Sequence, residues 1–356
     1  YKKNLTIDAK NSGTLGRLIL GLLIKSPKKI KIVGDKSLSK RDFSRVTVPL
    51  EKFGVKFYYK TKNKLPLSIL GSSTVRGINY LENKGSAQCK SSVILAAFRA
   101  PGTTFIKAKK SRNHTEVLCK YLKLPIKITN KKNYDFIEVK KVKKIKPLDY
   151  KIPSDISSSA FFLVLASLSR NSKLIISNVN VNPSRIGIIT ILKRMGVKII
   201  FKNKKIYKGE EIADIQVEST NKLKPIKCPT KLNSGAIDEF LVIFLVAAKA
   251  NGISIFKDLA ELDQKESPRL KWGSKILNMM GVKTVLTNNS IKIYGNPKLK
   301  IKDSIVIKDY LKDHRIFMMC SIAALTCGGK WKIHDPDSIK TSFPSFLEII
   351  NKLDKK

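Results

Sequence analysis

The chain of 356 residues has few histidines, cysteines and tryptophans. Its three histidines and five separated cysteines form no CxxC pair, so they predict neither a zinc site nor a disulfide framework. Most cysteines lie in apolar runs, as small core residues of a reducing compartment do. The longest apolar runs reach about a dozen residues, whereas a membrane helix needs about twenty. We therefore predict a cytoplasmic protein with no membrane association and no metal or other cofactor.

Acidic residues are also scarce: 27 Asp and Glu stand against 70 Lys and Arg, which gives a net charge of +43. Such a charge is typical of nucleic-acid-binding proteins. A nucleic-acid footprint is clustered, however, and these lysines are scattered along the whole chain, together with abundant isoleucine and asparagine. We interpret the lysine excess chiefly as a compositional bias, and keep a basic nucleic-acid-binding protein as an alternative.

Arginine is the scarce basic residue, with 11 Arg against 59 Lys. The planar guanidinium group presents a rigid pair of donors that matches a carboxylate or a phosphate, which the flexible lysine ammonium does not. In a chain that uses lysine so freely, the arginines are therefore candidates for contact with an anionic ligand.

A repeated pattern runs along the chain. A short polar entry leads into an apolar helix, a turn and a β-branched strand, in five copies about 75 residues apart that begin at Asn11, Ser86, Ser157, Asp238 and Asp313. Four copies add a second, amphipathic helix that ends in a turn and a strand. This alternation of helix and strand predicts an α/β (α+β type) protein built from repeated modules.

The five helix entrances are polar, with sequences such as NSGT, SAQ and DHR. Each could be an ordinary helix cap, since Asn, Ser and Asp are common capping residues. If pseudo-symmetry brings the entrances together, their unpaired backbone N–H groups and positive dipole ends form a site for a strongly anionic ligand. Five copies with the same polar opening favour a shared site.

The sequence IPSD, after a lysine-rich stretch, predicts a hinge between two domains, residues 1–153 and 154–356. The C-terminal domain holds three repeat starts and the N-terminal domain holds two. Because a symmetric protein would have three in each, we predict that one further unit precedes Tyr1.

Three stretches place charged residues beside apolar helices. ELDQKESPRL puts Lys265, Glu266 and Arg269 in a predicted loop, for which a surface salt-bridge cluster is the alternative. GAIDEFLVIFL and DHRIFMM put Asp238 and Arg315 at the entrances of helices so apolar that charges there need partners or a ligand. The carboxylates and the lysine are suited to proton transfer, and the arginines to holding a carboxylate or phosphate.

Ten motifs, in order along the chain, resemble those of the 5-enolpyruvylshikimate-3-phosphate synthase family: NSGTLGRL, GDKSLSKR with RVTVPLEKFG, GSAQCKS, SRNHTE, IPSDISSSAFFLV, NPSRIGIITILKRMG, IDEFLVIFLVAA, LDQKESPRL, DHRIFM and TSFPSFLEII. The resemblance implies the two-domain enolpyruvyl transferase fold, an inside-out α/β barrel of repeated units, here with one N-terminal unit missing. It also implies a reaction of the shikimate pathway to chorismate and the aromatic amino acids. The enolpyruvyl group of phosphoenolpyruvate passes to the 5-hydroxyl of shikimate 3-phosphate, and phosphate leaves from a tetrahedral intermediate.

The resemblance also implies roles for particular residues. Asp238 is the expected base at the attacking hydroxyl, and Lys265 and Glu266 are expected to carry the proton to and from the methylene carbon. The expected phosphoenolpyruvate-binding residues are Asn11, Gly13, Thr14, Arg41, Gln88, Arg269 and Arg315. The expected shikimate-3-phosphate-binding residues are Ser86, Ala87, Gln88, Arg112, Asp238 and Lys265. We expect a monomer whose only partners are these two small molecules, and Gly13 predicts sensitivity to glyphosate.

The chain departs from the family pattern in four places. The family motif Lys-Ser-x-Ser-x-Arg has no counterpart, so we predict that the chain as printed is inactive. Pro268 and Asn113 stand where the family has aspartate, and Ser154 stands where it has glycine. The sister UDP-N-acetylglucosamine enolpyruvyl transferase is the nearest alternative, although no cysteine lies in the arginine- and proline-rich loop expected of that enzyme.

Overall fold

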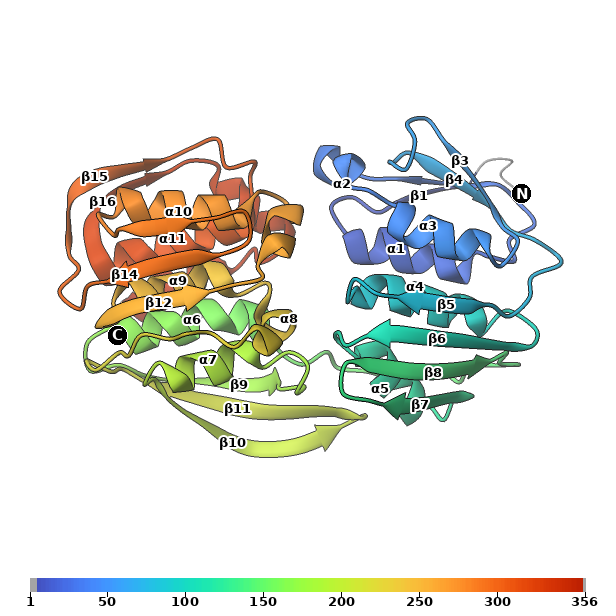
Figure 1. Cartoon of the computed structure of the whole chain (residues 1–356), viewed down its shortest axis with the longest axis horizontal. Coiled ribbons are helices and arrows are strands. Elements are labelled where there is room, and N and C mark those ends of the chain that lie inside the picture. The colour runs from blue at the N-terminus through green and yellow to red at the C-terminus, as the bar shows by residue number, and fades with distance from the viewer. Residues whose placement is uncertain (1–4, 355–356) are drawn as a thin grey trace. The chain divides into compact units, whose positions relative to one another are not determined.

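The computed structural model describes residues 5–354. The chain divides into two compact units, residues 1–150 (unit 1) and 151–356 (unit 2) (Figure 1). The domain boundary predicted after residue 153 lies a few residues beyond this division. Among residues 5–354, no helix has both the length and the apolar character to cross a membrane.

Unit 1 contains two copies of one arrangement, in which a strand, a helix and a parallel strand precede a further helix and antiparallel strands. The first copy, with sheet order β1-β2-β4-β3, comprises β1 (Leu5–Asp8), α1 (Gly13–Leu22), β2 (Ile30–Val33), α2 (Lys36–Lys40), α3 (Ser44–Glu51), β3 (Lys56–Tyr59) and β4 (Leu67–Leu70). The second, with order β5-β6-β8-β7, comprises β5 (Asn79–Glu82), α4 (Ala87–Ala97), β6 (Thr103–Lys109), α5 (His114–Tyr121), β7 (Ile126–Asn130) and β8 (Tyr134–Lys140).

Unit 2 continues the repeat with three more copies. The first, with sheet order β10-β11-β9, comprises α6 (Ile156–Leu168), β9 (Lys173–Asn180), α7 (Gly187–Arg194), β10 (Lys198–Tyr207) and β11 (Glu210–Glu218). The second, with order β12-β14-β13, comprises α8 (Asn233–Ala236), α9 (Phe240–Ala248), β12 (Gly252–Phe256), α10 (Arg269–Met279), β13 (Thr284–Leu286) and β14 (Ile291–Gly295). The third comprises β15 (Ile301–Ile307), α11 (His314–Cys327), β16 (Gly328–Ile333) and α12 (Phe346–Asp354). The predicted repeat and its amphipathic second helices are therefore confirmed.

The first helices of the later copies, α4, α6, α9 and α11, lie largely in the core, whereas α1 is amphipathic and leaves Leu15 and Leu22 exposed. Every residue of α9 is buried. In unit 1, α1 and α4 pack side by side, and a Cβ at Gly21 would lie only 2.2 Å from the backbone oxygen of Ser92. Glycine is needed there for the two backbones to touch. All five cysteines are free and buried, whereas the sequence predicted core positions for most of them.

Side chains cap four of the five predicted helix entrances. Ser12, Ser86, Asp155 and Asp313 each accept a hydrogen bond from a backbone N–H in the first turn of their helix. The fifth entrance differs from the prediction, because α9 begins at Phe240 and no side chain caps it. The Asp238 carboxylate is therefore not a helix cap, and contacts basic side chains instead.

Candidate active site

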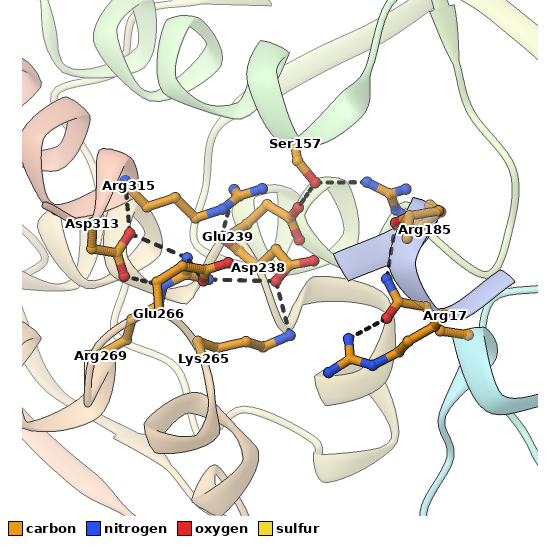
Figure 2. A network of polar contacts seen from close by, with 12 residues as sticks. Arg17, Ser157, Arg185, Asp238, Glu239, Lys265, Glu266, Arg269, Asp313 and Arg315 are labelled. Carbon is orange, nitrogen blue, oxygen red and sulfur yellow. Dashed lines mark hydrogen bonds and ion pairs between the residues drawn. The ribbon is translucent and has the colours of Figure 1, made fainter. Parts of the chain in front are cut away.

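Asp238 and Lys265 meet in a polar cluster of unit 2, shown in Figure 2. Asp238 lies in the turn between α8 and α9, and Lys265 follows the short 3₁₀ helix Ala260–Gln264. The Lys265 Nζ atom is 3.0 Å from Asp238 Oδ1, and the two side chains are 27% and 13% exposed. A carboxylate and an ammonium group that solvent can reach are able to exchange protons with a bound substrate.

Arg269 is surrounded by three carboxylates. Its guanidinium nitrogens lie 2.8 Å from Asp313 Oδ2, 2.5 Å from Glu266 Oε2 and 3.6 Å from Asp238 Oδ1. The sequence predicted Arg269 in a loop; the structure makes it the first residue of α10, after Pro268. This corrects the prediction: the helix starts directly behind the proline, whose fixed φ does not disturb a helix beginning there. The Arg269 side chain is only 2% exposed, so the surface salt-bridge alternative is wrong.

Asp313 holds the Arg269 guanidinium from the entrance of α11. Its buried carboxylate also accepts hydrogen bonds from Ser267 Oγ at 2.8 Å and from the Arg315 backbone N–H at 3.0 Å. Burial opposes ionisation, but the Arg269 charge outweighs it and holds the pKa of Asp313 below its ordinary value. Burial also disfavours the Arg269 cation, yet Asp313 and the other two carboxylates raise its pKa. Both groups are therefore charged at neutral pH.

Arg315 and His314 complete the entrance of α11. Arg315 Nη1 donates to the backbone oxygen of Asp238 at 2.8 Å, which ties α11 to the turn before α9. Burial, followed by the neighbouring Arg315 charge, lowers the pKa of His314 to about 4. The His314 imidazole is therefore neutral at neutral pH.

A second polar group joins α6 to the same turn. The buried Glu239 carboxylate accepts a hydrogen bond from Ser157 Oγ. Arg185 donates to Ser157 Oγ at 2.6 Å and lies 3.0 Å from Asp155 Oδ1. Burial alone would raise the pKa of Asp155, but the charges of Arg185 and Arg315 outweigh it and lower the pKa. Because Glu239 follows Asp238 directly, these contacts help to fix the Asp238 backbone.

In unit 1, the predicted ligand-binding residues lie at the entrances of α1 and α4. Gln88 Nε2 donates to Thr14 Oγ1 at 2.9 Å, and Gln88 Oε1 accepts from Arg17 at 2.6 Å. The Arg17 guanidinium carbon lies 5.3 Å from the centre of the Phe43 ring. Burial lowers the pKa of Arg17. The two helix entrances are thus joined by side chains that can also bind a ligand.

Two guanidinium groups border Gly13. A Cβ at this position would lie 3.0 Å from one terminal nitrogen of Arg17 and 3.4 Å from one of Arg41. Nearby, Asn11 Nδ2 donates at 2.5 Å to Asp35, the residue that caps α2. The concentration of arginine at a helix N-terminus favours an anionic ligand.

The structure gathers most predicted site residues into two sets, one in each unit. The set in unit 2 comprises Asp238, Lys265, Glu266, Arg269 and Arg315, and the set at the α1 and α4 entrances of unit 1 comprises Asn11, Gly13, Thr14, Arg41, Ser86, Ala87 and Gln88. Arg112 lies in the segment before α5. The sequence placed Asp313 and Glu239 at the entrances of apolar helices, where a charge needs a partner or a ligand, but did not predict which groups they contact. Among the residues that the structure describes, no cluster of His, Cys, Asp and Glu could hold a metal ion.

The repeated modules, with charged residues at their helix entrances, are those of the two-domain enolpyruvyl transferase fold. The chain belongs to the EPSP synthase (3-phosphoshikimate 1-carboxyvinyltransferase) family, whose model matches residues 1–350.

Named relatives and solved structures agree with this assignment. The chain is 41% identical to the 3-phosphoshikimate 1-carboxyvinyltransferase of Ruthia magnifica, with 99% of this chain and 79% of that protein covered. It is 36% identical to the Bacillus subtilis protein of the same name, with coverage of 98% and 80%. The EPSP synthase of Acinetobacter baumannii superposes with a TM-score of 0.85 at 34% identity, covering 98% of this chain and 78% of that one. The enolpyruvyl transferase NikO from Streptomyces tendae, at 13% identity, TM-score 0.70 and coverage of 95% and 75%, shares the fold. These matches favour neither the UDP-N-acetylglucosamine enzyme nor a nucleic-acid-binding protein.

Proposed function

We propose that Asp238, Lys265 and Glu266 form the reaction centre for the enolpyruvyl transfer of this family. In that reaction, phosphoenolpyruvate gives its enolpyruvyl group to the 5-hydroxyl of shikimate 3-phosphate, and phosphate is released. The observation that carries the proposal is the 3.0 Å contact between Lys265 Nζ and Asp238 Oδ1, beside a carboxylate that Arg269 holds in place.

The first half of the reaction needs a base and an acid at the same place. Asp238 accepts the proton of the 5-hydroxyl as its oxygen attacks C2 of phosphoenolpyruvate. The methylene carbon gains a proton in the same step, and Lys265 and Glu266 are the candidates to deliver it. The Lys265 ammonium also stabilises negative charge in the tetrahedral intermediate that results.

The second half reverses the proton transfer at carbon. Phosphate leaves from C2, a proton returns from the methyl group to the protein, and the double bond of the enolpyruvyl ether forms. Glu266 is the candidate to accept this proton. Its carboxylate lies 2.5 Å from Arg269, which fixes its position.

Anion binding is assigned to the remaining residues. For phosphoenolpyruvate, we propose Arg315 and Arg269 in unit 2 and the arginine-bordered entrance of α1 in unit 1, with Asn11, Gly13, Thr14, Arg41 and Gln88. For shikimate 3-phosphate, we propose Arg112 and the Ser86–Gln88 entrance of α4, with Asp238 and Lys265 of unit 2. Helix N-termini and guanidinium groups both suit phosphate and carboxylate.

Phosphate release by the protein expressed from its complete open reading frame tests the proposal. Release should require both phosphoenolpyruvate and shikimate 3-phosphate. Asp238→Asn should lower the rate by about 100-fold or more, because it removes the base. The matched control is Asp258→Asn. Asp258 is an exposed aspartate of the same unit, so this variant should keep the wild-type rate. Equal rates in the two variants would overturn the proposed role of Asp238.

We also propose that the protein works as a cytoplasmic monomer without nucleic acid. The scattered distribution of its lysines supports the absence of nucleic acid, since a nucleic-acid footprint is clustered. Light scattering should give the mass of one chain, and DNA should leave phosphate release unchanged. Salt-dependent retention on DNA without phosphate release would favour the nucleic-acid-binding alternative.

A further inference from the structure

Helix α4 of unit 1 is fixed to α1 by polar side chains. Near its start, Gln88 contacts Thr14 and Arg17 of α1 at 2.9 and 2.6 Å. One turn later, Ser92 Oγ donates to the backbone oxygen of Arg17 at 3.0 Å. The entrance of α4, where Ser86 is the cap, therefore has a defined position relative to α1.

The other side of α4 is fixed to α5 by two neighbouring pairs. Lys90 Nζ lies 2.5 Å from Glu116 Oε1, and the two side chains are 0% and 4% exposed. The Ser91 and Thr115 hydroxyl groups form a hydrogen bond of 2.7 Å beside them. Two consecutive residues of α4 thus pair with two consecutive residues of α5. These two pairs restrict sliding and rotation of α5 along α4.

Stability alone does not account for the Lys90–Glu116 ion pair. Removing two charges from water costs free energy that their attraction often fails to recover, so apolar residues of similar volume serve stability equally well. Within residues 5–354, the Lys90 ammonium contacts no carboxylate other than Glu116, and Glu116 Oε2 has no hydrogen-bond partner. A shift of either helix would leave both charges buried and separated, so the pair permits one arrangement only.

That arrangement sets the position of the segment before α5. The segment contains Arg112, four residues ahead of Glu116, and Ser111, whose buried hydroxyl has no hydrogen-bond partner among the described residues. We propose that Lys90 and Glu116 are positioning residues that hold Arg112 and Ser111 at the right place beside the Ser86–Gln88 entrance. Arg112, Ser111 and the Ser86–Gln88 entrance together bind the phosphate-bearing substrate. The inference rests on the proposed function, since it assigns this side of unit 1 to shikimate 3-phosphate.

The double variant Lys90→Met/Glu116→Leu tests the inference in the protein from the complete open reading frame. It removes both charges at once, so that neither is left buried alone, and replaces them with apolar side chains of similar length. We expect circular dichroism and the thermal midpoint to stay close to wild type. The KM for shikimate 3-phosphate should rise about tenfold or more, because misplaced binding groups weaken the contact, while kcat and the KM for phosphoenolpyruvate stay within about twofold.

Two controls separate positioning from folding. Lys90→Arg/Glu116→Asp keeps an ion pair of similar total length, and should restore the KM for shikimate 3-phosphate to near the wild-type value. Lys198→Met/Glu218→Leu removes a partly exposed pair of unit 2 and should change neither KM. An unchanged KM in the Lys90/Glu116 double variant, or an equal rise for both substrates, would overturn the positioning role alone. A wild-type protein that released no phosphate would instead overturn the proposed function, and the inference with it.

Discussion

Arg269 and Asp313 form a two-point ion pair in the interior of unit 2. Arg269 Nε donates to Asp313 Oδ2 at 2.8 Å, and a terminal nitrogen donates to Oδ1 at 3.2 Å. The two residues lie on the first turn of α10 and at the cap of α11, 44 positions apart in the sequence. The planar fork of arginine fits a carboxylate in this way, so the pair fixes the angle as well as the position of the guanidinium group.

Asp313→Asn should destabilise unit 2 by about 3 kcal/mol, because it leaves the Arg269 charge buried without its main partner. Urea unfolding followed by tryptophan fluorescence measures this, since both tryptophans, Trp272 and Trp331, lie in unit 2. The control is Asp337→Asn, which breaks an exposed pair with Lys340 and should leave the free energy of unfolding unchanged. Equal stability of the two variants would refute the importance of the buried pair.

Lys265→Met should lower kcat by about 100-fold or more while the fold persists. The lysine stem is kept, its side chain is 27% exposed, and only the ammonium that contacts Asp238 is lost. Phosphate release gives kcat, and circular dichroism reports on folding. Lys271→Met, on the exposed side of α10, provides the comparison and should retain full activity. A Lys265→Met protein as fast as wild type would exclude a role for the ammonium in the reaction.

His314 should make unit 2 less stable in mild acid. Its pKa is about 4 in the folded protein and 6.5 ordinarily, so the unfolded chain binds more protons between these values. Stability then rises with pH through this window and is lost as pH falls, by about 2 kcal/mol between pH 6.5 and 4.5. The measurement is tryptophan-detected urea unfolding of wild type and His314→Gln at several pH values. In His314→Gln, the free energy of unfolding should fall less between pH 6.5 and 4.5 than in wild type. Identical pH dependence of the free energy of unfolding in the two proteins would show that His314 titrates normally.

Gly13→Ala should weaken inhibition by glyphosate. The added Cβ would lie 3.0 Å from an Arg17 nitrogen, so the Arg17 guanidinium must shift by a few tenths of an ångström at the predicted phosphoenolpyruvate site, while the 3.4 Å to an Arg41 nitrogen is ordinary contact. We expect wild-type turnover to be inhibited, with an inhibition constant about tenfold higher in the variant. Gly16→Ala is the control, because the atoms nearest to its Cβ would be those of the Phe43 ring and Ala9, at 3.4 to 3.5 Å, which is ordinary van der Waals contact. Turnover of wild type that persists at high glyphosate would contradict the prediction.

The sequence predicted the modular fold because the signals for it are local. Polar caps, apolar helices and β-branched strands recur within segments of ten to twenty residues, and neighbouring residues suffice to specify each element. The same signals placed Ser86 and Asp313 correctly at helix entrances. They were wrong for Asp238, since two short helical segments separated by a turn have the same composition as one capped helix.

The order of the motifs along the chain was sufficient to indicate the family, which the comparisons confirmed. What the sequence alone determined was therefore the repeat, the class of each segment and the residues with suitable chemistry. Only the tertiary structure decided which charges meet. The pairs Arg269–Asp313 and Lys90–Glu116 join residues on different helices, and the sequence pattern of one helix does not predict which residue of another helix it will contact. Those contacts exist because an amphipathic second helix, α5 or α10, packs near an apolar first helix, α4 or α11, and a buried charge then takes the opposite charge that packing places beside it.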